Sequence, residues 1–242
     1  MFDRSVRYSY TAQKHERRRL LRAVIVLLVL FTLYNLISAL FVSVWVLQNE
    51  SMQPGLQAGD RFIVMSATLP SLLTQIRGTE YTSPFKRGQI VLVDTGLREQ
   101  RKMSLVIADS IVRFCTAQRA SIFAKEERLY FKRLIGLPGD EISMNNFVMR
   151  IRPAGDSYTL TEFELSDKPY YPNIPHVPAL WDESLPFSGN MELLNLGTGE
   201  CFVLSDDRSS TSDSRTWGPV PTELVSGRVV FRYWPLSRIG LP

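Results

Sequence analysis

The sequence predicts a mostly β domain preceded by one N-terminal transmembrane helix. Two observations carry this prediction. From residue 61 onward, short apolar runs alternate with Gly, Pro, Asn and Asp, which is typical of strands joined by turns. Residues 23–47, in contrast, form one run of 25 residues without a charge. The length of 242 residues allows one sizeable domain with additional segments.

The N-terminal segment is expected to be a basic tail followed by a membrane anchor. Residues 1–22 hold seven basic and two acidic residues, and the remainder has one more acidic than basic residue, so the net charge of +4 comes from this tail. No nucleic-acid-binding surface on the main domain is therefore expected. As a helix, residues 23–47 would be about 37 Å long, enough to cross a hydrocarbon core of about 30 Å. The run is apolar on almost every face, unlike a core helix, and it is too long for a cleavable signal peptide.

The charge distribution also predicts the topology. Because the positive residues precede the apolar run, residues 1–22 are expected in the cytoplasm and residues 48–242 outside it. The anchor would then cross the membrane once.

Eight strands are expected in the domain, at residues 62–65, 90–94, 129–135, 141–143, 147–151, 158–163, 201–204 and 225–233. Residues 144–146 suit a hairpin turn, since asparagine tolerates positive φ. Residues 97–125 show an amphipathic helical pattern, either packed on the domain as an insertion or lying on the membrane surface. Residues 169–186 are rich in proline and aromatic residues, which indicates an extended loop or lid.

Cysteine and histidine are scarce. Cys115 and Cys201 have no second thiol or histidine at ligand spacing, so a zinc site is not expected, and they are either one disulfide or two free thiols. Outside the tail, which holds His15, the only histidine is His176. A serine nucleophile in this chain would therefore lack its usual base.

Three short patches could carry chemistry. The first is the Ser-Met-Gln-Pro-Gly-Leu run of residues 51–56, where Ser51 is either a loop residue or a nucleophile that needs a base. The second, residues 130–140, places Lys132 among apolar residues, where burial would lower its pKa, although an edge-strand lysine could also point to solvent. The third, residues 205–215, mixes hydroxyls, carboxylates and arginines, and is either a polar loop or a hydrogen-bonded cluster.

Together the three patches resemble the bacterial type I signal peptidases, also called leader peptidases, which are membrane-anchored serine endopeptidases with a Ser/Lys dyad. Residues 51–56 match the family signature Ser-Met-x-Pro-Thr-Leu except at Gly55. Residues 132–140 match Lys-Arg-x-x-Gly-x-Pro-Gly-Asp completely. The third signature is matched at Asp206, Arg208, Asp213, Ser214 and Arg215. The resemblance implies a mostly β catalytic core with a β-rich insertion, expected within residues 141–198.

The resemblance also implies a role for each matched position. Ser51 corresponds to the nucleophile, Lys132 to the general base and Asn49 to a side-chain oxyanion donor. Thr211 falls at the hydroxyl position that orients the lysine, and Asp213 and Arg215 match supporting residues. Pockets for small substrate residues are implied at Leu47, Met52, Leu56, Tyr130 and Phe131. No metal or cofactor is implied. The implied partners are the signal peptides of exported pre-proteins and the lipid bilayer of the cell membrane.

The chain departs from the family pattern at a few positions. Gly55 replaces threonine, Gln89 replaces an acidic residue, Ser205 replaces glycine and Thr211 replaces serine. The departures at Gly55 and Ser205 leave open an alternative function, a catalytically impaired membrane-tethered homologue that binds secreted chains. A soluble self-cleaving repressor-like protease with a Ser/Lys dyad is opposed by the anchor, and a purely structural anchor protein by the match at residues 132–140.

Overall fold

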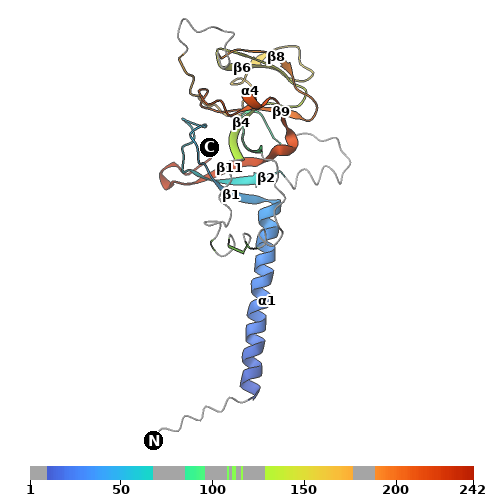
Figure 1. Ribbon diagram of the computed structural model, residues 1–242, viewed down its shortest axis with the longest axis vertical. Coiled ribbons are helices and arrows are strands. Elements are labelled where there is room, and N and C mark those ends of the chain that lie inside the picture. Colours follow the sequence, from blue (N-terminus) through green and yellow to red (C-terminus); the bar gives the residue numbers. More distant parts are fainter. Residues whose placement is uncertain are drawn as a thin grey trace. The chain divides into compact units, whose positions relative to one another are not determined.

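The computed structural model describes residues 10–67, 85–95, 108, 111–112, 116, 129–176 and 189–242, without the side chains of 10–14 and 36–40. The chain divides into two compact units (Figure 1). One comprises Met1–Ser38 and Arg101–Ala124, and the other comprises Ala39–Gln100 and Lys125–Pro242. Most of the predicted amphipathic helix at 97–125, including Cys115, lies outside the described residues, as does much of the predicted loop at 169–186.

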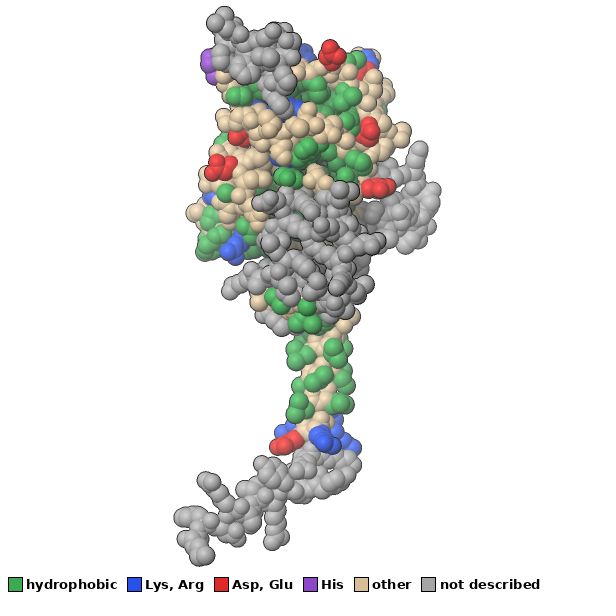
Figure 2. All heavy atoms as spheres, viewed as in Figure 1, with side chains coloured by type: hydrophobic (Ala, Val, Ile, Leu, Met, Phe, Trp, Pro, Cys, Tyr) green, Lys and Arg blue, Asp and Glu red, His purple; other side chains and the backbone are tan. Residues whose placement is uncertain are grey.

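The first unit contains most of the long helix α1, Tyr10–Leu40. Its side chains from Leu20 to Leu33 are mainly apolar and exposed (Figure 2). The hydroxyl of Thr32 and the amide of Asn35 donate to carbonyls one turn earlier in the same helix, so neither needs an outside partner. Among the described residues, no helix meets the length and apolarity needed to cross a membrane.

The predicted transmembrane helix at 23–47 is therefore not supported, and its bounds are wrong. The helix ends at Leu40, and Val42–Val46 form strand β1. The physical reason is that β1 pairs with β2 over its full length, from Val42 opposite Met65 to Val46 opposite Arg61. The apolar run thus supplies both a helix and a strand with β-branched residues.

The second unit contains a seven-stranded antiparallel sheet in the order β1-β2-β11-β3-β4-β9-β10 (Figure 1). Its remaining strands are β2 Arg61–Ser66, β3 Ile90–Asp94, β4 Leu129–Gly136, β9 Glu200–Leu204, β10 Val220–Pro221 and β11 Val225–Trp234. The mostly β fold is confirmed, whereas β1 and β10 were not predicted.

Both faces of this sheet are covered, and this is what buries β4. Successive residues of a strand face opposite sides of the sheet, so Leu92 of β3 packs in one apolar cluster and Val91 in another. The register places Phe131 opposite Leu92 and Lys132 opposite Val91. Consecutive residues of β4 therefore enter opposite sides of the sheet, and Lys132 is fully buried.

A second, four-stranded sheet has the order β7-β6-β5-β8. Its strands are β5 Glu141–Asn145, β6 Val148–Arg152, β7 Leu160–Thr161 and β8 Met191–Asn195, of which β8 was not predicted and β7 is shorter than predicted. The turn between β5 and β6 lies one or two residues later than predicted, at Asn146 and Phe147, whose φ angles are 49° and 65°. Three short helices, α4 Ser214–Trp217, η1 Thr222–Leu224 and η2 Leu236–Arg238, complete the described part of this unit.

Candidate active site

Ser51 lies in the turn that connects β1 with β2. This turn is fixed by backbone hydrogen bonds, in which Leu47 N–H donates to the Asp60 carbonyl and Gly59 N–H to the Leu47 carbonyl, at 2.9 and 2.8 Å. The Asp207 N–H donates to the Ser51 carbonyl at 3.0 Å, which joins the first predicted patch to the third. Only 9% of Ser51 is exposed. The nucleophile candidate is thus held on a short, well-anchored turn.

Lys132 brings the second patch to the same point. Its Nζ donates to Ser51 Oγ at 3.2 Å and to Ser205 Oγ at 2.8 Å. The rings of Tyr130 and Trp217 flank it, with centroids 5.7 and 5.8 Å from Nζ. A nucleophilic serine and its base are expected within about 2.6–3.2 Å of each other, and the Ser51–Lys132 distance lies at the upper end of this range.

The surroundings of Lys132 favour its neutral form. Burial lowers its pKa from 10.5 to about 8, and the positive charge of Arg215 acts in the same direction, whereas the carboxylates of Asp213 and Asp206 oppose the shift. A substantial fraction of Lys132 is therefore neutral near pH 8. An amine in this state can accept a proton from a serine hydroxyl.

Asn49 lies next to the dyad, but in an orientation that differs from the expected one. Ser51 Oγ donates to Asn49 Oδ1 at 2.9 Å. The Asn49 oxygen, rather than its NH₂ group, therefore faces the nucleophile here. This contact holds the Ser51 proton away from Lys132, so the hydroxyl must rotate before Lys132 can accept it.

Asp213 and Arg215 support the site from behind. Arg215 donates to Asp213 through Nε and Nη2, at 3.0 and 2.8 Å, and Nη1 donates to the Arg208 carbonyl at 2.9 Å. Burial alone would raise the pKa of Asp213, but the Arg215 guanidinium and backbone N–H groups hold it below its usual value. Asp213 also accepts the Ser205 N–H at 3.0 Å. The pair thus fixes the backbone of Ser205, the residue that contacts Lys132.

The structure places Thr211, the hydroxyl predicted to orient Lys132, on the surface. Its side chain is exposed, and its carbonyl accepts a hydrogen bond from Thr216 Oγ1. The hydroxyl that contacts Lys132 belongs to Ser205, which stands where the resemblance leads one to expect glycine. Ser205 contacts Lys132 because of the register between β4 and β9. Leu204 lies opposite Arg133 in the β4–β9 ladder, so the next residue of the β9 chain falls beside Lys132.

The five predicted pocket residues separate into two groups. Leu47, Met52, Leu56 and Phe131 belong to one buried apolar cluster, together with Phe62, Val64, Ile90, Leu92 and Val229. Tyr130 lies opposite Val93 on the other side of the sheet, and its ring packs 5.2 Å from that of Trp217. Four of the five are therefore brought together, and Tyr130 instead flanks Lys132.

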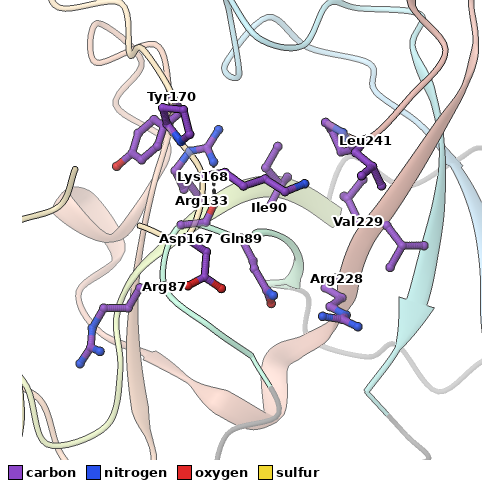
Figure 3. Close-up of a pocket in the computed structure, with 14 residues that line it drawn as sticks. Arg87, Gln89, Ile90, Arg133, Asp167, Lys168, Tyr170, Arg228, Val229 and Leu241 are labelled. Carbon is purple, nitrogen blue, oxygen red and sulfur yellow. Dashed lines mark hydrogen bonds between the residues drawn. The ribbon is translucent and has the colours of Figure 1, made fainter. Parts of the chain in front are cut away.

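A separate pocket of about 560 Å³ lies around the start of β3 and contains none of these five residues (Figure 3). Arg133 forms part of its wall. The Arg133 guanidinium binds Asp206 through Nε and Nη2, at 2.7 and 2.5 Å, and lies 3.9 Å from the centroid of the Tyr170 ring. Sequence reasoning gave no role to Arg133, although it lies within the second signature.

A buried ion pair joins Glu162, which directly follows β7, to Arg208 in the segment after β9. Arg208 Nη2 donates to Glu162 Oε2 at 2.5 Å, and both side chains are almost fully buried. Tyr170 Oη donates to the same carboxylate oxygen at 2.6 Å, and the Met149 N–H to its other oxygen at 3.0 Å. Arg208 was recognised as part of the third signature, but nothing in the sequence indicated Glu162 as its partner.

The described residues offer no cluster of three or more His, Cys, Asp or Glu side chains that could hold a metal ion. Cys201 is a buried free thiol whose sulfur donates to the Val220 carbonyl at 3.2 Å. Burial raises the pKa of this thiol to about 12, so it is protonated at neutral pH. His176 is exposed.

Comparison with known proteins identifies the class of protein to which the chain belongs. A family profile described as "Signal peptidase, peptidase S26" matches residues 17–234, so the chain belongs to the signal peptidase family. Signal peptidase IB of Staphylococcus aureus (strain Mu50 / ATCC 700699) is 23% identical over 223 residues, which are 91% of this chain and 93% of that protein.

Other relatives match over shorter stretches. Signal peptidase I of Bacillus caldolyticus is 33% identical over 121 residues, covering 48% of this chain and 60% of the relative. Thylakoidal processing peptidase 1, chloroplastic, of Arabidopsis thaliana is 48% identical over 55 residues, covering 23% of this chain and 16% of the relative. The matches to these two relatives thus span less than two thirds of their length.

Proposed function

We propose that the chain is a serine endopeptidase that cleaves N-terminal signal peptides from exported pre-proteins, with Ser51 as nucleophile and Lys132 as general base. The observation that carries the proposal is the 3.2 Å contact between Ser51 Oγ and the buried Lys132 Nζ. Membership of the signal peptidase family supports the substrate class. In the described part of the chain, no other base approaches the Ser51 hydroxyl.

The reaction moves two protons through Lys132, one from Ser51 to the leaving amine and one from water back to Ser51. Neutral Lys132 takes the proton of Ser51 Oγ as this oxygen attacks the scissile carbonyl, and the Ser51 N–H stabilises the resulting oxyanion. The protonated lysine then gives its proton to the leaving amine as the C–N bond breaks. A water that donates a proton to Lys132 attacks the acyl-enzyme, and Lys132 returns this proton to Ser51 Oγ as the ester bond breaks and the signal peptide is released. Asn49 is placed to assist if its amide turns from the Ser51 proton to the oxyanion.

The substrate is proposed to bind as an extended strand. β1 is an edge strand, and the β4–β9 pairing begins only at Arg133, so residues 129–132 have no β9 partner. Backbone groups beside both dyad residues are therefore placed to pair with a peptide. The side chains of Leu47, Met52, Leu56 and Phe131 already pack closely, which favours small residues before the cleavage site.

Lipid is proposed as a second partner, through α1. Exposed apolar residues such as Val24, Leu27 and Leu30 would be covered by contact with a bilayer, which fits a protein of the cell membrane. The cytoplasmic placement of residues 1–22 and the extracytoplasmic placement of residues 48–242 stay predictions. Co-sedimentation of the chain with phospholipid vesicles, lost on removal of residues 1–40, tests the lipid contact.

The dyad is tested by cleavage of a purified pre-protein in detergent micelles, with the cut position determined by mass spectrometry. Ser51→Ala and Lys132→Ala should each abolish cleavage while the melting temperature stays within a few degrees. Lys168→Ala, which changes an exposed lysine, is the matched control and should cleave normally. Retained cleavage by either dyad variant overturns the mechanism. A wild-type chain that binds the pre-protein without cutting it would instead indicate the impaired homologue.

The pH dependence gives an independent test of the base. Because Lys132 must be neutral to act, kcat/KM should fall about tenfold per pH unit below a midpoint near 8, the pKa of Lys132. The profile should be unchanged in His176→Ala, since that imidazole is exposed and plays no part in the proposed mechanism. An acid limb that disappears in His176→Ala would contradict the assignment.

A further inference from the structure

The Lys132 amine is held at two points, and the shorter contact is not with the nucleophile. Nζ lies 2.8 Å from Ser205 Oγ and 3.2 Å from Ser51 Oγ. A lysine side chain has four rotatable bonds, so one contact alone would leave the direction of its lone pair undetermined. Within the described residues, no carboxylate lies within hydrogen-bonding distance of Nζ. Ser205 therefore supplies the second fixed point.

Ser205 is itself rigidly placed. It is fully buried, and its N–H donates to Asp213 Oδ2 at 3.0 Å. The preceding residue, Leu204, is paired with Arg133 in the sheet. The Ser205 hydroxyl is thus anchored from the strand side by the β4–β9 ladder and from the loop side by the Asp213–Arg215 pair.

From this geometry we infer that Ser205 is the residue that positions the Lys132 amine for proton transfer from Ser51. The inference rests on the proposed Ser51–Lys132 dyad. A neutral amine has two N–H bonds and one lone pair. When one N–H donates to Ser205 Oγ, the lone pair can be directed at the Ser51 hydroxyl. Without the Ser205 oxygen, the amine can turn its lone pair away from Ser51.

Thr211 is the competing candidate, because it is the hydroxyl that the sequence pattern favours for this role. Its side chain is exposed, and the Thr216 hydroxyl bonds to its backbone carbonyl. Ser205 and Thr211 lie six residues apart on one segment, so each hydroxyl can be removed by substitution while the other is kept.

The test compares Ser205→Ala with Thr211→Ala in the pre-protein cleavage assay, measuring kcat, KM and the pH profile. Ser205→Ala should lower kcat by about 10- to 100-fold, the range expected when a catalytic group is misplaced, with KM within twofold of wild type. Thr211→Ala should change kcat by less than threefold. Ser209→Ala, an exposed serine of the same segment, is the matched control.

The acid limb separates a positioning role from a structural one. An acceptor oxygen stabilises the ammonium form, so Ser205→Ala should move the acid limb of kcat/KM to lower pH while the plateau falls. The charged groups that act on Lys132, namely Asp206, Asp213 and Arg215, are unchanged in this variant. A merely structural loss would reduce the amount of active enzyme and leave the limb where it is. Ser205→Gly lacks the same hydroxyl and must show the same two changes.

Three results would overturn the inference. They are an unchanged kcat in Ser205→Ala, a loss of kcat with an unmoved acid limb in both Ser205 variants, and an equal loss in Thr211→Ala. Ser51→Ala and Lys132→Ala are measured in parallel. If these two remain active, the proposed function fails. If they are inactive while Ser205→Ala is fully active, the dyad stands and only the positioning role of Ser205 is wrong.

Discussion

Lys132 and Arg133 are consecutive basic residues on β4, but their side chains have different kinds of hydrogen-bond partners. Both are buried, with exposed fractions of 0% and 8%. Arg133 faces a carboxylate, with its Nε and Nη2 bound to the two oxygens of Asp206. The hydrogen-bond partners of Lys132 are two hydroxyls, those of Ser51 and Ser205. The strand pleat is what sends the two side chains to different surroundings.

The difference indicates that Arg133 stabilises the fold, whereas Lys132 is able to take part in proton transfer. A guanidinium keeps its proton in proteins, so burying Arg133 requires a carboxylate. An amine can lose its proton, and burial lowers the pKa of Lys132 to about 8. Hydroxyl partners still allow Lys132 to lose its proton, whereas a directly bonded carboxylate would stabilise the protonated amine. Substitutions that exchange the two side chains or remove their partners therefore test this difference.

The largest effect is expected when Lys132 is made like its neighbour. Lys132→Arg places a permanently charged guanidinium beside Ser51, and this group cannot accept the serine proton. Since general-base catalysis contributes about 10²–10⁴-fold, cleavage of a pre-protein should fall by a factor in this range. The rate is measured by a single-turnover assay with excess enzyme.

The arginine is also larger than the buried lysine, so stability must be followed in parallel. Lys132→Met, which is close in shape to lysine and carries no charge, is the matched variant and should be equally inactive but stable. Cleavage by Lys132→Met would mean that another group deprotonates Ser51.

The second effect concerns stability rather than chemistry. Asp206→Ala leaves the buried Arg133 guanidinium without its carboxylate, so the free energy of unfolding should fall by about 3–5 kcal/mol. Urea denaturation measures this loss. Adding Arg133→Met to Asp206→Ala should recover part of it, because the unpaired charge is then gone. A double variant less stable than Asp206→Ala alone would show that Arg133 acts mainly through its packing on Tyr170.

The pairing of Ser51 with Lys132 was expected only from the resemblance of residues 51–56 and 132–140 to family signatures, and the two side chains lie 3.2 Å apart. The sequence was not sufficient to identify the hydroxyl that contacts Lys132. Ser205 and Thr211 belong to one polar segment, and only the β4–β9 register, with Arg133 opposite Leu204, decides between them. In the same way, the face on which Tyr130 lies depends on pairing with Val93, which no local pattern reveals.

Most strands were predicted from the turn residues between them, whereas β1, β8 and β10 were missed. β1 continues an apolar run without an intervening Gly or Pro, so Val42–Val46 looked like the end of a helix. Its conformation is instead set by pairing with β2, a tertiary effect that overrides the local pattern. β10, Val220–Pro221, has only two residues and is too short to leave a periodic signal.

A smaller effect follows from the linkage between the Lys132 proton and folding. Below pH 8 the lysine is protonated in both the folded and the unfolded chain, and the folded chain carries the cost of burying the charge. Above pH 10.5 it is neutral in both, and that cost is absent. Between these values the unfolded chain binds more protons, so the free energy of unfolding should rise with pH, by about 3 kcal/mol from Lys132 alone.

This contribution is isolated by comparison with Lys132→Met, which has no proton to bind at this position. Urea denaturation of both chains at pH 8 and pH 10.5 gives the difference, so other groups that titrate in this range cancel. Lys168→Met, at an exposed lysine, should behave like wild type. An equal pH response of wild type and Lys132→Met would mean that burial does not lower the pKa of Lys132.

The smallest effect is expected when Arg133 is made like Lys132. Arg133→Lys keeps a positive charge beside Asp206 but gives up the two-point contact, the donation to the Gly88 carbonyl and the stacking on Tyr170. Because hydrogen bonds to charged groups contribute about 1.5–3 kcal/mol and a lysine retains one of them, the free energy of unfolding should fall by about 2 kcal/mol. That loss is smaller than the one expected for Asp206→Ala, since no buried charge is left unpaired. Urea denaturation distinguishes the two, and an equal loss would show that the geometry of the Arg133–Asp206 pair matters as much as its charge balance.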